Sequence, residues 1–531
     1  MSKFILPLVI AALLMSFLRL GFVSLFDVDE AVFSTATREM VHSGDWIMPT
    51  YNGEKRYDKP VLFYWLMAAS YKTFGINNFA ARFPSALAAL LLAVALFLFV
   101  KRINGEKKAF YAAVSFVLSI YYIIYSHAAV TDMTLTLFIS LSLFSFYMST
   151  IHPKNRDSDR FMETKSDKTV AVPIFRARYL YGFYAFSALA FLTKGLIGIV
   201  FPFGIAVIYL YASGGWAGLR HIINIKGMVL FLVISAPWYL AQIAINGQEF
   251  IDQFFIKHHF MRYAGVISGH SGPLYFYIPA LLIGLFPWVA FLPSGIRAVF
   301  RDKDRLDLFA FIWAVFIVLF FSLSTTKLPN YILPAVPGIV ILIASGMSAG
   351  TKKWNHAAYV TMAFLAAILG SGLLLARPYL VRHGIPEDVV PVIAGVLMAG
   401  IVLADVYALI TDKKMYYVIC LITGFFMVVL LVQTLPAANG YLQGALYRYS
   451  LYAKDRLQPG EPIIEYGINK PSIVFYSGHR VVNAGRKNDL SAIVDKTRHA
   501  IVIAKTKDSG EIESLGFNVV ARDAQYALFE R

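Results

Sequence analysis

The chain has 531 residues, of which 58% are hydrophobic and only 15% are charged. Its mean hydropathy of +0.62 excludes a soluble globular protein, because such a chain would have too little polar surface for its length. The formal net charge of +16 could indicate nucleic-acid binding, but the basic residues lie mainly in gaps between apolar segments, where membrane topology accounts for them. The single cysteine, Cys420, lies inside an apolar segment and excludes a disulfide framework.

About thirteen apolar segments have the length expected of membrane helices, since roughly 20 apolar residues cross the bilayer core. They cover residues 4–23, 83–100, 109–126, 133–150, 179–193, 196–212, 228–245, 273–296, 308–323, 331–348, 356–376, 389–410 and 415–434. The first segment has no small-residue cleavage site, so we expect a retained signal anchor with a cytoplasmic N-terminus. We predict a polytopic α-helical membrane protein.

Basic residues fill alternate gaps between these segments, and the positive-inside rule places such gaps in the cytoplasm. They include Lys101, Arg102, Lys107, Lys108, Arg220, Lys226, Arg297, Arg301, Lys352, Lys353, Lys413 and Lys414. The loop at 24–82, the loop at 246–272 and the C-terminal tail are then expected on the opposite side of the membrane.

Four cationic residues lie on this outward side, at the ends of apolar segments: Lys59, Lys194, Arg262 and Lys327. A single lysine in such a place is more often an interfacial residue that snorkels to the headgroups. Four of them in short loops favour an anionic ligand such as a lipid phosphate, because several cationic donors together hold phosphate best.

The chain changes character near residue 436, which divides a transmembrane domain (1–436) from a C-terminal domain (437–531). Short β-rich runs alternate there with helix-compatible stretches. The runs cover 461–467, 474–482, 500–505, 518–524 and 526–530, and the helical stretches cover 469–476, 488–498 and 508–515. This pattern predicts a small α/β domain on the outward side. We expect it to cover or brace the membrane domain.

The first outward loop, at about 24–82, is charged and aromatic, and is where we expect chemistry, because charge near a membrane is costly and usually functional. Residues 30–41 (EAVFSTATREMV) have apolar side chains at helical spacing, which indicates an amphipathic helix on the membrane surface. Asp29 falls at the expected N-cap of this helix. Asp is favoured there for structural reasons, so capping and catalysis explain Asp29 equally well.

A second helix can start at Pro60, and Asp58 and Lys59 would then lie just before its N-terminus. The other acidic signal is Asp132, which follows His127 in the run HAAVTDMT and opens an apolar segment. Helix capping again competes with function. Two outward carboxylates from different loops, together with the cationic cluster, predict a site where a phosphate leaves and an oxygen nucleophile attacks.

The loop sequence DEAVFSTATREMVHSGDWIMPTYNGEKRYDKPVLFYW resembles the first periplasmic loop of the bacterial aminoarabinose transferase family and its protein O-mannosyltransferase relatives. These families belong to the GT-C membrane glycosyltransferases, which use polyprenyl-phosphate sugars as donors. The runs SHAAVTDMTLTLF, TKGLIGIVFP, PWYLAQIAINGQEFIDQFFIKHHFMRYAG and STTKLPNYILPAVP extend the match through about residues 26–340. The resemblance implies a GT-C fold of about thirteen transmembrane helices with a small C-terminal periplasmic domain.

The resemblance also implies roles for individual residues. Asp29 would be the principal catalytic carboxylate and Asp132 the second, and we place Glu30 with them. Lys59 and Arg262 would hold the donor phosphate, supported by Lys327 and Lys194. The substrate pocket is expected to include Asp27, Asp58, Tyr57, Tyr331 and His258, and roles could be exchanged between Asp27 and Asp29.

One departure from the family pattern concerns a metal. The family commonly has Glu where this chain has Asp58, and in some relatives that Glu and histidines bind a metal ion. The side chain of Asp58 is one methylene shorter, which puts the same role in doubt here. We expect no required cofactor, and the candidates for a bound zinc ion are Asp58, His258, His259 and His479, with His270 as a further possible partner.

The resemblance implies an inverting glycosyltransferase of the bacterial inner membrane, active on the periplasmic face. The favoured reaction moves 4-amino-4-deoxy-L-arabinose from undecaprenyl phosphate to lipid A or a related envelope acceptor. One alternative is transfer of mannose, galacturonate or a hexosamine to lipid, polysaccharide or protein. A second is a flippase or transporter of lipid-linked sugars, which should have ionisable residues deep in its spans. Asp405 is the only acid well inside a predicted span.

Overall fold

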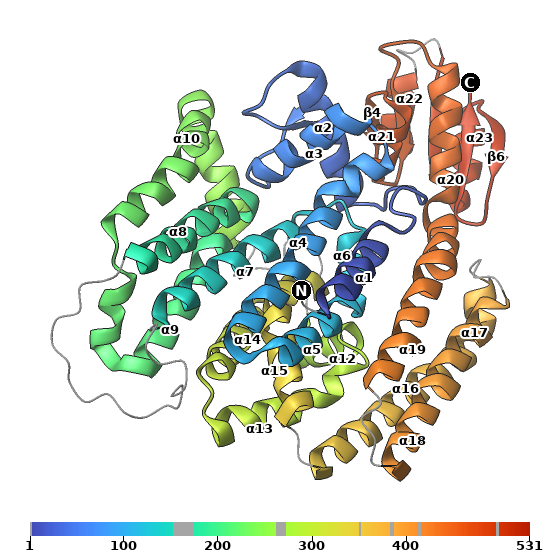
Figure 1. Cartoon of the computed structure of the whole chain (residues 1–531). Coiled ribbons are helices and arrows are strands. Elements are labelled where there is room, and N and C mark those ends of the chain that lie inside the picture. Colours follow the sequence, from blue (N-terminus) through green and yellow to red (C-terminus); the bar gives the residue numbers. More distant parts are fainter. Residues whose placement is uncertain are drawn as a thin grey trace.

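The computed structural model of the protein describes residues 3–151, 174–261, 272–349, 352–382, 387–411, 416–494 and 499–531. These residues form a body of packed helices with a small sheet at one end (Figure 1). The helices of the first half are α1 (Ile5–Phe17), α2 (Asp29–Ser43), α3 (Leu62–Phe74), α4 (Asn78–Asn104), α5 (Glu106–Val117), α6 (Ile120–Ser126), α7 (Thr131–Thr150), α8 (Ile174–Lys194), α9 (Ile197–Gly218), η1 (Leu219–Ile222), α10 (Ile225–Phe250) and η2 (Ile251–Met261).

The second half of the helical body runs from Leu274 to Arg456. It contains η3 (Leu274–Phe276), α12 (Tyr277–Gly284), η4 (Trp288–Phe291), α13 (Leu292–Asp302), α14 (Arg305–Leu323), η5 (Pro329–Ala335), α15 (Val336–Ala349), α16 (Lys352–Arg382), α17 (Val389–Gly395), η6 (Val396–Ile401), α18 (Val402–Thr411), α19 (Tyr416–Val429), η7 (Leu430–Thr434) and α20 (Leu435–Arg456).

Within the described residues, nine helices are long and apolar enough to cross a membrane, or up to eleven if each of two bent pairs is one span. These residues therefore do not confirm the expected count of thirteen. The first predicted span shortens to α1, with 13 residues, and Arg19 just beyond it adopts a φ of 57° that a helix cannot continue. The predicted spans 109–126 and 273–296 are bent by 58° and 112°.

The first loop folds into α2, a hairpin of β1 (Thr50–Tyr51) and β2 (Glu54–Lys55), and α3. Asn52 and Gly53 both take positive φ in the tight turn, the arrangement that an Asn-Gly pair favours. The predicted surface helix at 30–41 exists as α2, but it packs against α3 and the C-terminal helix α21 (Pro471–Ser477). Its buried face therefore contacts protein, in place of the membrane surface that we expected.

The C-terminal domain has a five-stranded sheet in the order β4-β3-β5-β7-β6, in which β3 pairs in parallel with β4 and β5, and β7 is antiparallel to β5 and β6. The elements are β3 (Ile463–Tyr466), β4 (Val481–Ala484), α22 (Lys487–Val494), β5 (Ile501–Lys505), η8 (Thr506–Asp508), α23 (Ser509–Glu513), β6 (Asn518–Arg522) and β7 (Tyr526–Glu530). The prediction of a strand at 474–482 is correct only at its C-terminal end, where β4 begins. Its first residues belong to α21, because Pro471 starts that helix and Gly478 ends it in the left-handed conformation.

The C-terminal domain is fastened to the first loop by side chains that bond to backbone groups. Asp27 accepts hydrogen bonds from the backbone N–H and the hydroxyl of Ser472, at 2.8 and 2.9 Å. Asn52 exchanges two hydrogen bonds with the backbone of Val481, at 2.8 and 3.0 Å. Because these contacts join residues more than 400 positions apart, the loop and the domain form one unit at the same end of the body (Figure 1).

A buried carboxyl lies close to this junction. Glu465 on β3 is 4% exposed and accepts a hydrogen bond from the backbone N–H of Lys470. Burial raises the pKa of Glu465 to about 7, and the nearby Asp27 carboxylate adds to the effect. The carboxyl is thus protonated more readily in the folded domain than in the unfolded chain.

This shift predicts that the folded domain loses stability as the pH rises. A raised pKa means that the folded state binds the extra proton, so its stabilising contribution is complete below pH 4.5 and is lost as the pH passes about 7. The full change corresponds to about 3 kcal/mol. In Glu465→Gln, the melting temperature of the purified protein should vary less between pH 5 and pH 8 than in the wild type. An equally steep pH dependence in the variant would contradict this.

Candidate functional site

Asp29 is the first residue of α2, at the end of the body where the loop and the C-terminal domain meet. The N-cap of α2 is Val28, which has no capping side chain, so the expectation that Asp29 caps the helix is wrong by one residue. The side chain is exposed. Among the described residues, its carboxylate accepts no hydrogen bond and forms no ion pair. Asp29 is therefore accessible to a ligand.

A cationic cluster lies beside Asp29. The guanidinium of Arg56 donates to Asp58 at 2.8 Å and to the hydroxyl of Tyr64 at 2.9 Å, and the ammonium of Lys59 lies 2.7 Å from the other oxygen of Asp58. Burial lowers the pKa of Arg56, but Tyr64 and the carboxylates of Asp58 and Asp29 outweigh it and raise the pKa overall. Arg56 thus places a cation next to the exposed carboxylate, and Asp58 bridges Arg56 to Lys59.

Glu30 points away from this cluster into the protein. It forms a bidentate ion pair with Arg82 of α4, with N–O distances of 2.8 and 2.9 Å, and Arg82 is 1% exposed. Glu30 also accepts hydrogen bonds from the backbone N–H groups of Phe26, at 2.9 Å, and Ala129, at 2.6 Å. This buried setting favours a structural role for Glu30 over the predicted catalytic role, which stays a prediction.

Asp132 lies in the first turn of α7 and is 4% exposed. Its carboxylate accepts from the ammonium of Lys194, at the end of α8, at 2.7 Å, and from the amide of Asn330 in η5 at 3.0 Å. The same ammonium lies 5.6 Å from the ring centroid of Tyr331. The N-cap of α7 is Val130, so Asp132 is not a cap. Three separate helical elements thus converge on this carboxylate.

The two acidic positions are connected through Glu30. The hydrogen bond from the N–H of Ala129 to Glu30 fixes the loop that leads into α7, three residues before Asp132. Side chains of α2, this loop and α8 also share one buried apolar cluster, which contains Ala31, Phe33, Ala129, Val130 and Leu192. Asp29 and Asp132 therefore belong to elements that are held together at one end of the body.

The other predicted residues lie in different settings. Asp27 is used at the junction with Ser472 described above, rather than in a pocket. Tyr57 is buried and packs its ring near Phe250, with centroids 6.1 Å apart. Lys327 is 6% exposed, and its ammonium donates to the backbone carbonyl of Ser324 at 2.5 Å.

Several predicted residues lie outside the described part of the chain. They are Arg262 and His270, together with the side chains of His258 and His259.

The described residues show no complete set of metal ligands. They contain no group of three or more His, Cys, Asp or Glu residues placed to hold a metal. Asp58 is engaged by Arg56 and Lys59. His479 lies in the C-terminal domain, with its Nδ1 3.0 Å from the carbonyl oxygen of Glu461.

Sequence reasoning missed three residues that shape the site: Arg56, Arg82 and Asn330. A signal existed for Arg82, because an arginine within an apolar helix must have a partner. Asn330 follows Lys327 by three residues in the run STTKLPNY, which drew attention to the lysine alone. Arg56 is one of several charges in the loop, and nothing local distinguishes it.

Several known proteins with sequences similar to this chain are described as sugar transferases. A family model described as dolichyl-phosphate-mannose-protein mannosyltransferase matches residues 58–158. An undecaprenyl phosphate-alpha-4-amino-4-deoxy-L-arabinose arabinosyl transferase of Shewanella sediminis is 31% identical over 338 residues, which cover 62% of this chain and 57% of that protein. An uncharacterized protein of Aquifex aeolicus is 31% identical over 66% of this chain and 74% of its own length. The chain thus spans little more than half of the Shewanella relative.

Solved structures share the fold. The crystal structure of ArnT from Cupriavidus metallidurans bound to undecaprenyl phosphate superposes with a TM-score of 0.81, covering 100% of this chain and 98% of that one, at 24% identity. The archaeal oligosaccharyltransferase AglB from Archaeoglobus fulgidus gives a TM-score of 0.52 at 10% identity, over 96% of this chain and 70% of that one. At these identities the likeness establishes the fold and not the activity.

The geometry predicts that Glu30→Gln damages stability more than chemistry. Removing one partner of a buried ion pair typically costs about 3–5 kcal/mol, because it leaves the other charge uncompensated. We expect a lower melting temperature and less than a tenfold change in activity per folded molecule, measured below that temperature. The control Glu54→Gln, on the exposed strand β2, should change neither quantity. A loss of a hundredfold or more with an unchanged melting temperature would restore the catalytic role of Glu30.

Proposed function

This chain belongs to the polyprenyl-phosphate-dependent membrane glycosyltransferases that include the aminoarabinose transferases, and on that premise we propose that it transfers 4-amino-4-deoxy-L-arabinose from undecaprenyl phosphate to lipid A or a related envelope acceptor. The named relatives carry out transfer from this donor class, according to their descriptions. We place the reaction on the periplasmic face of the inner membrane, with a cytoplasmic N-terminus, because the basic gaps predict that orientation.

One arrangement supports the proposal above all others. The exposed carboxylate of Asp29 lies beside a cationic cluster, and a second carboxylate, that of Asp132, belongs to helices that are held against the helix of Asp29. Asp29 is accessible and Arg56 lies next to it, Asp58 bridges Arg56 to Lys59, and Asp132 is held by Lys194. A reaction with an anionic leaving group needs cations at the departing oxygen and an anion near the carbon that becomes positive.

The chemistry follows from the donor. An oxygen of the acceptor attacks the anomeric carbon from the side opposite the lipid phosphate, so one C–O bond forms, another breaks, and the configuration inverts. Lys59 and Arg56, with Arg262 and Lys327 as further candidates, would stabilise the departing phosphate. An acceptor phosphate is already a nucleophile, so Asp29 would then orient the sugar and stabilise positive charge at the anomeric carbon. With a hydroxyl acceptor, Asp29 would take its proton.

Because Lys194 forms an ion pair with Asp132, we propose a different role for Lys194. Its ammonium is 2.7 Å from that carboxylate, so it positions Asp132 rather than standing free for the donor phosphate. Tyr331, beside the same ammonium, remains a candidate for contact with substrate.

A second candidate reaction is transfer of mannose to a protein hydroxyl. The observation that favours it is the match of residues 58–158 to the mannosyltransferase family model, because this range includes Lys59 and Asp132. In that reaction Asp29 would be a general base, and the donor would carry mannose instead of aminoarabinose.

Mass spectrometry of lipid A tests the proposal directly. Lipid A from cells that make the protein should carry an added aminopentose, which should be absent from cells without it. Asp29→Asn should lower the modified fraction by two or more orders of magnitude, since Asn keeps the shape but not the charge of a key catalytic group. A mannosylated protein together with unmodified lipid A would identify the second candidate instead.

The matched control is Asp45→Asn, an exposed carboxylate in the same loop that bonds only backbone N–H groups nearby. It should leave lipid A modification close to normal. Near-normal modification with Asp29→Asn, at an equal level of protein in the membrane, would contradict the assignment of Asp29.

A further inference from the structure

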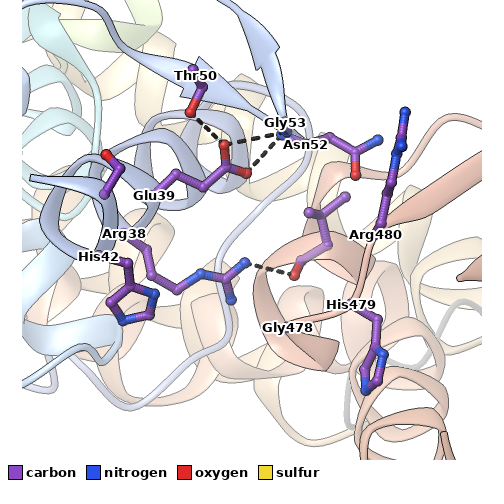
Figure 2. Close-up of a pocket in the computed structure, with 11 residues that line it drawn as sticks. Arg38, Glu39, His42, Thr50, Asn52, Gly53, Gly478, His479 and Arg480 are labelled. Atoms are coloured by element: carbon purple, nitrogen blue, oxygen red, sulfur yellow. Dashed lines mark hydrogen bonds between the residues drawn. The ribbon is translucent and has the colours of Figure 1, made fainter. Parts of the chain in front are cut away.

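A cleft of about 660 Å³ lies between the first loop and the C-terminal domain, away from Asp29. One wall comes from the second half of α2, with Arg38 and His42, and the opposite wall from the residues after α21, with His479 and Arg480. Figure 2 shows His42 beside Arg38 on one side, and His479 and Arg480 on the other. Neither domain forms this cleft alone.

The charged side chains that line the cleft differ in whether they can bind a ligand. The carboxylate of Glu39 accepts three hydrogen bonds, from the hydroxyl of Thr50 at 2.6 Å and from the N–H groups of Asn52 and Gly53 at 2.7 and 3.3 Å (Figure 2). The guanidinium of Arg480 is exposed and, within the described part of the chain, bonds to no other side chain. The acid is therefore satisfied internally, while a cation is left available to a ligand.

The cleft is built in advance of any ligand. Arg38 donates to the backbone carbonyls of Phe475 and Val474, at 2.6 and 3.1 Å, which locks α2 to the end of α21. The reciprocal pair between Asn52 and Val481 fixes the hairpin to β4. Because the walls are already ordered, binding of a ligand here would cost little conformational entropy.

We propose that this cleft binds the phosphate group of a phosphorylated saccharide, as a site separate from the transfer site. Arg480 and His42 supply donors to phosphate oxygens from opposite walls, and Arg38 has N–H groups beyond the two that bond Phe475 and Val474. Guanidinium groups suit phosphate geometry especially well. The hydroxyls of Ser43 and Thr50 and the amide of Asn52 can bond sugar hydroxyls.

The polar lining of the cleft also disfavours apolar ligands. Val474 is the only aliphatic side chain in it, so acyl chains and apolar molecules gain nothing by binding. Its volume lies in the range of sites for small organic ligands and exceeds what a bare phosphate ion requires. A free sugar phosphate and the headgroup of a phosphorylated glycolipid both carry such a phosphate, and the same contacts recognise both.

The test measures binding of N-acetylglucosamine 1-phosphate to the purified full-length protein by broadening of its ³¹P resonance. All proteins carry Asp29→Asn, so that binding is read without transfer. The pair His42→Gln/Arg480→Gln removes one exposed donor from each wall and should weaken binding about tenfold or more. Arg486→Gln, an exposed arginine of the same domain outside the cleft, and Lys59→Gln, in the proposed transfer site, should each change it less than about twofold.

Competition distinguishes the sources. Lipid A in mixed micelles should displace the sugar phosphate if a glycolipid headgroup can enter, and failure to displace it would assign the cleft to soluble sugar phosphates. Unchanged binding in His42→Gln/Arg480→Gln, with binding lost in Lys59→Gln, would overturn the proposal by placing the phosphate in the transfer site. Displacement by neutral N-acetylglucosamine at equal concentration would also overturn it. Melting temperatures should show that every variant is folded.

Discussion

The buried ion pair between Glu30 and Arg82 is the interaction on which the candidate site depends. Both side chains are almost fully buried, and Glu30 accepts four hydrogen bonds from three separate parts of the chain. Such a pair is seldom a net source of stability, because desolvation of both charges is costly. Its value here is geometric. It sets the start of α2, and therefore Asp29, against the loop that leads to Asp132.

The C-terminal domain also helps to fix the position of Asp29. Asp27, two residues before Asp29, is held by Ser472, so the chain around the exposed carboxylate is fixed from inside by Arg82 and from outside by the domain. A catalytic group must be held within a fraction of an ångström of its productive position. The small domain thus contributes to the site without supplying a reactive group to it, and in doing so it creates the cleft lined by Arg38 and Arg480.

The sequence predicted the membrane class and the α/β character of the C-terminal domain, because these follow from hydropathy and from local patterns, and it pointed to Asp29 and Asp132 as candidate site residues. It did not predict the partners. Glu30 and Arg82 are 52 residues apart, and Asp132 and Asn330 are 198 apart, so no local periodicity connects them. The sequence places Glu30 beside Asp29, but adjacent residues of a helix point in different directions, and the Glu30 carboxylate lies against Arg82 inside the protein.

We propose that Asp29 and Asp132 act as one site, and a double-mutant cycle on purified protein tests this most directly. Transfer from undecaprenyl-phosphate-linked aminoarabinose would be measured for Asp29→Asn, Asp132→Asn and the double variant, with melting temperatures alongside. Groups that act as a unit are non-additive, so the double variant should be little slower than the slower single variant. Losses that multiply, or full activity of Asp132→Asn, would contradict the account.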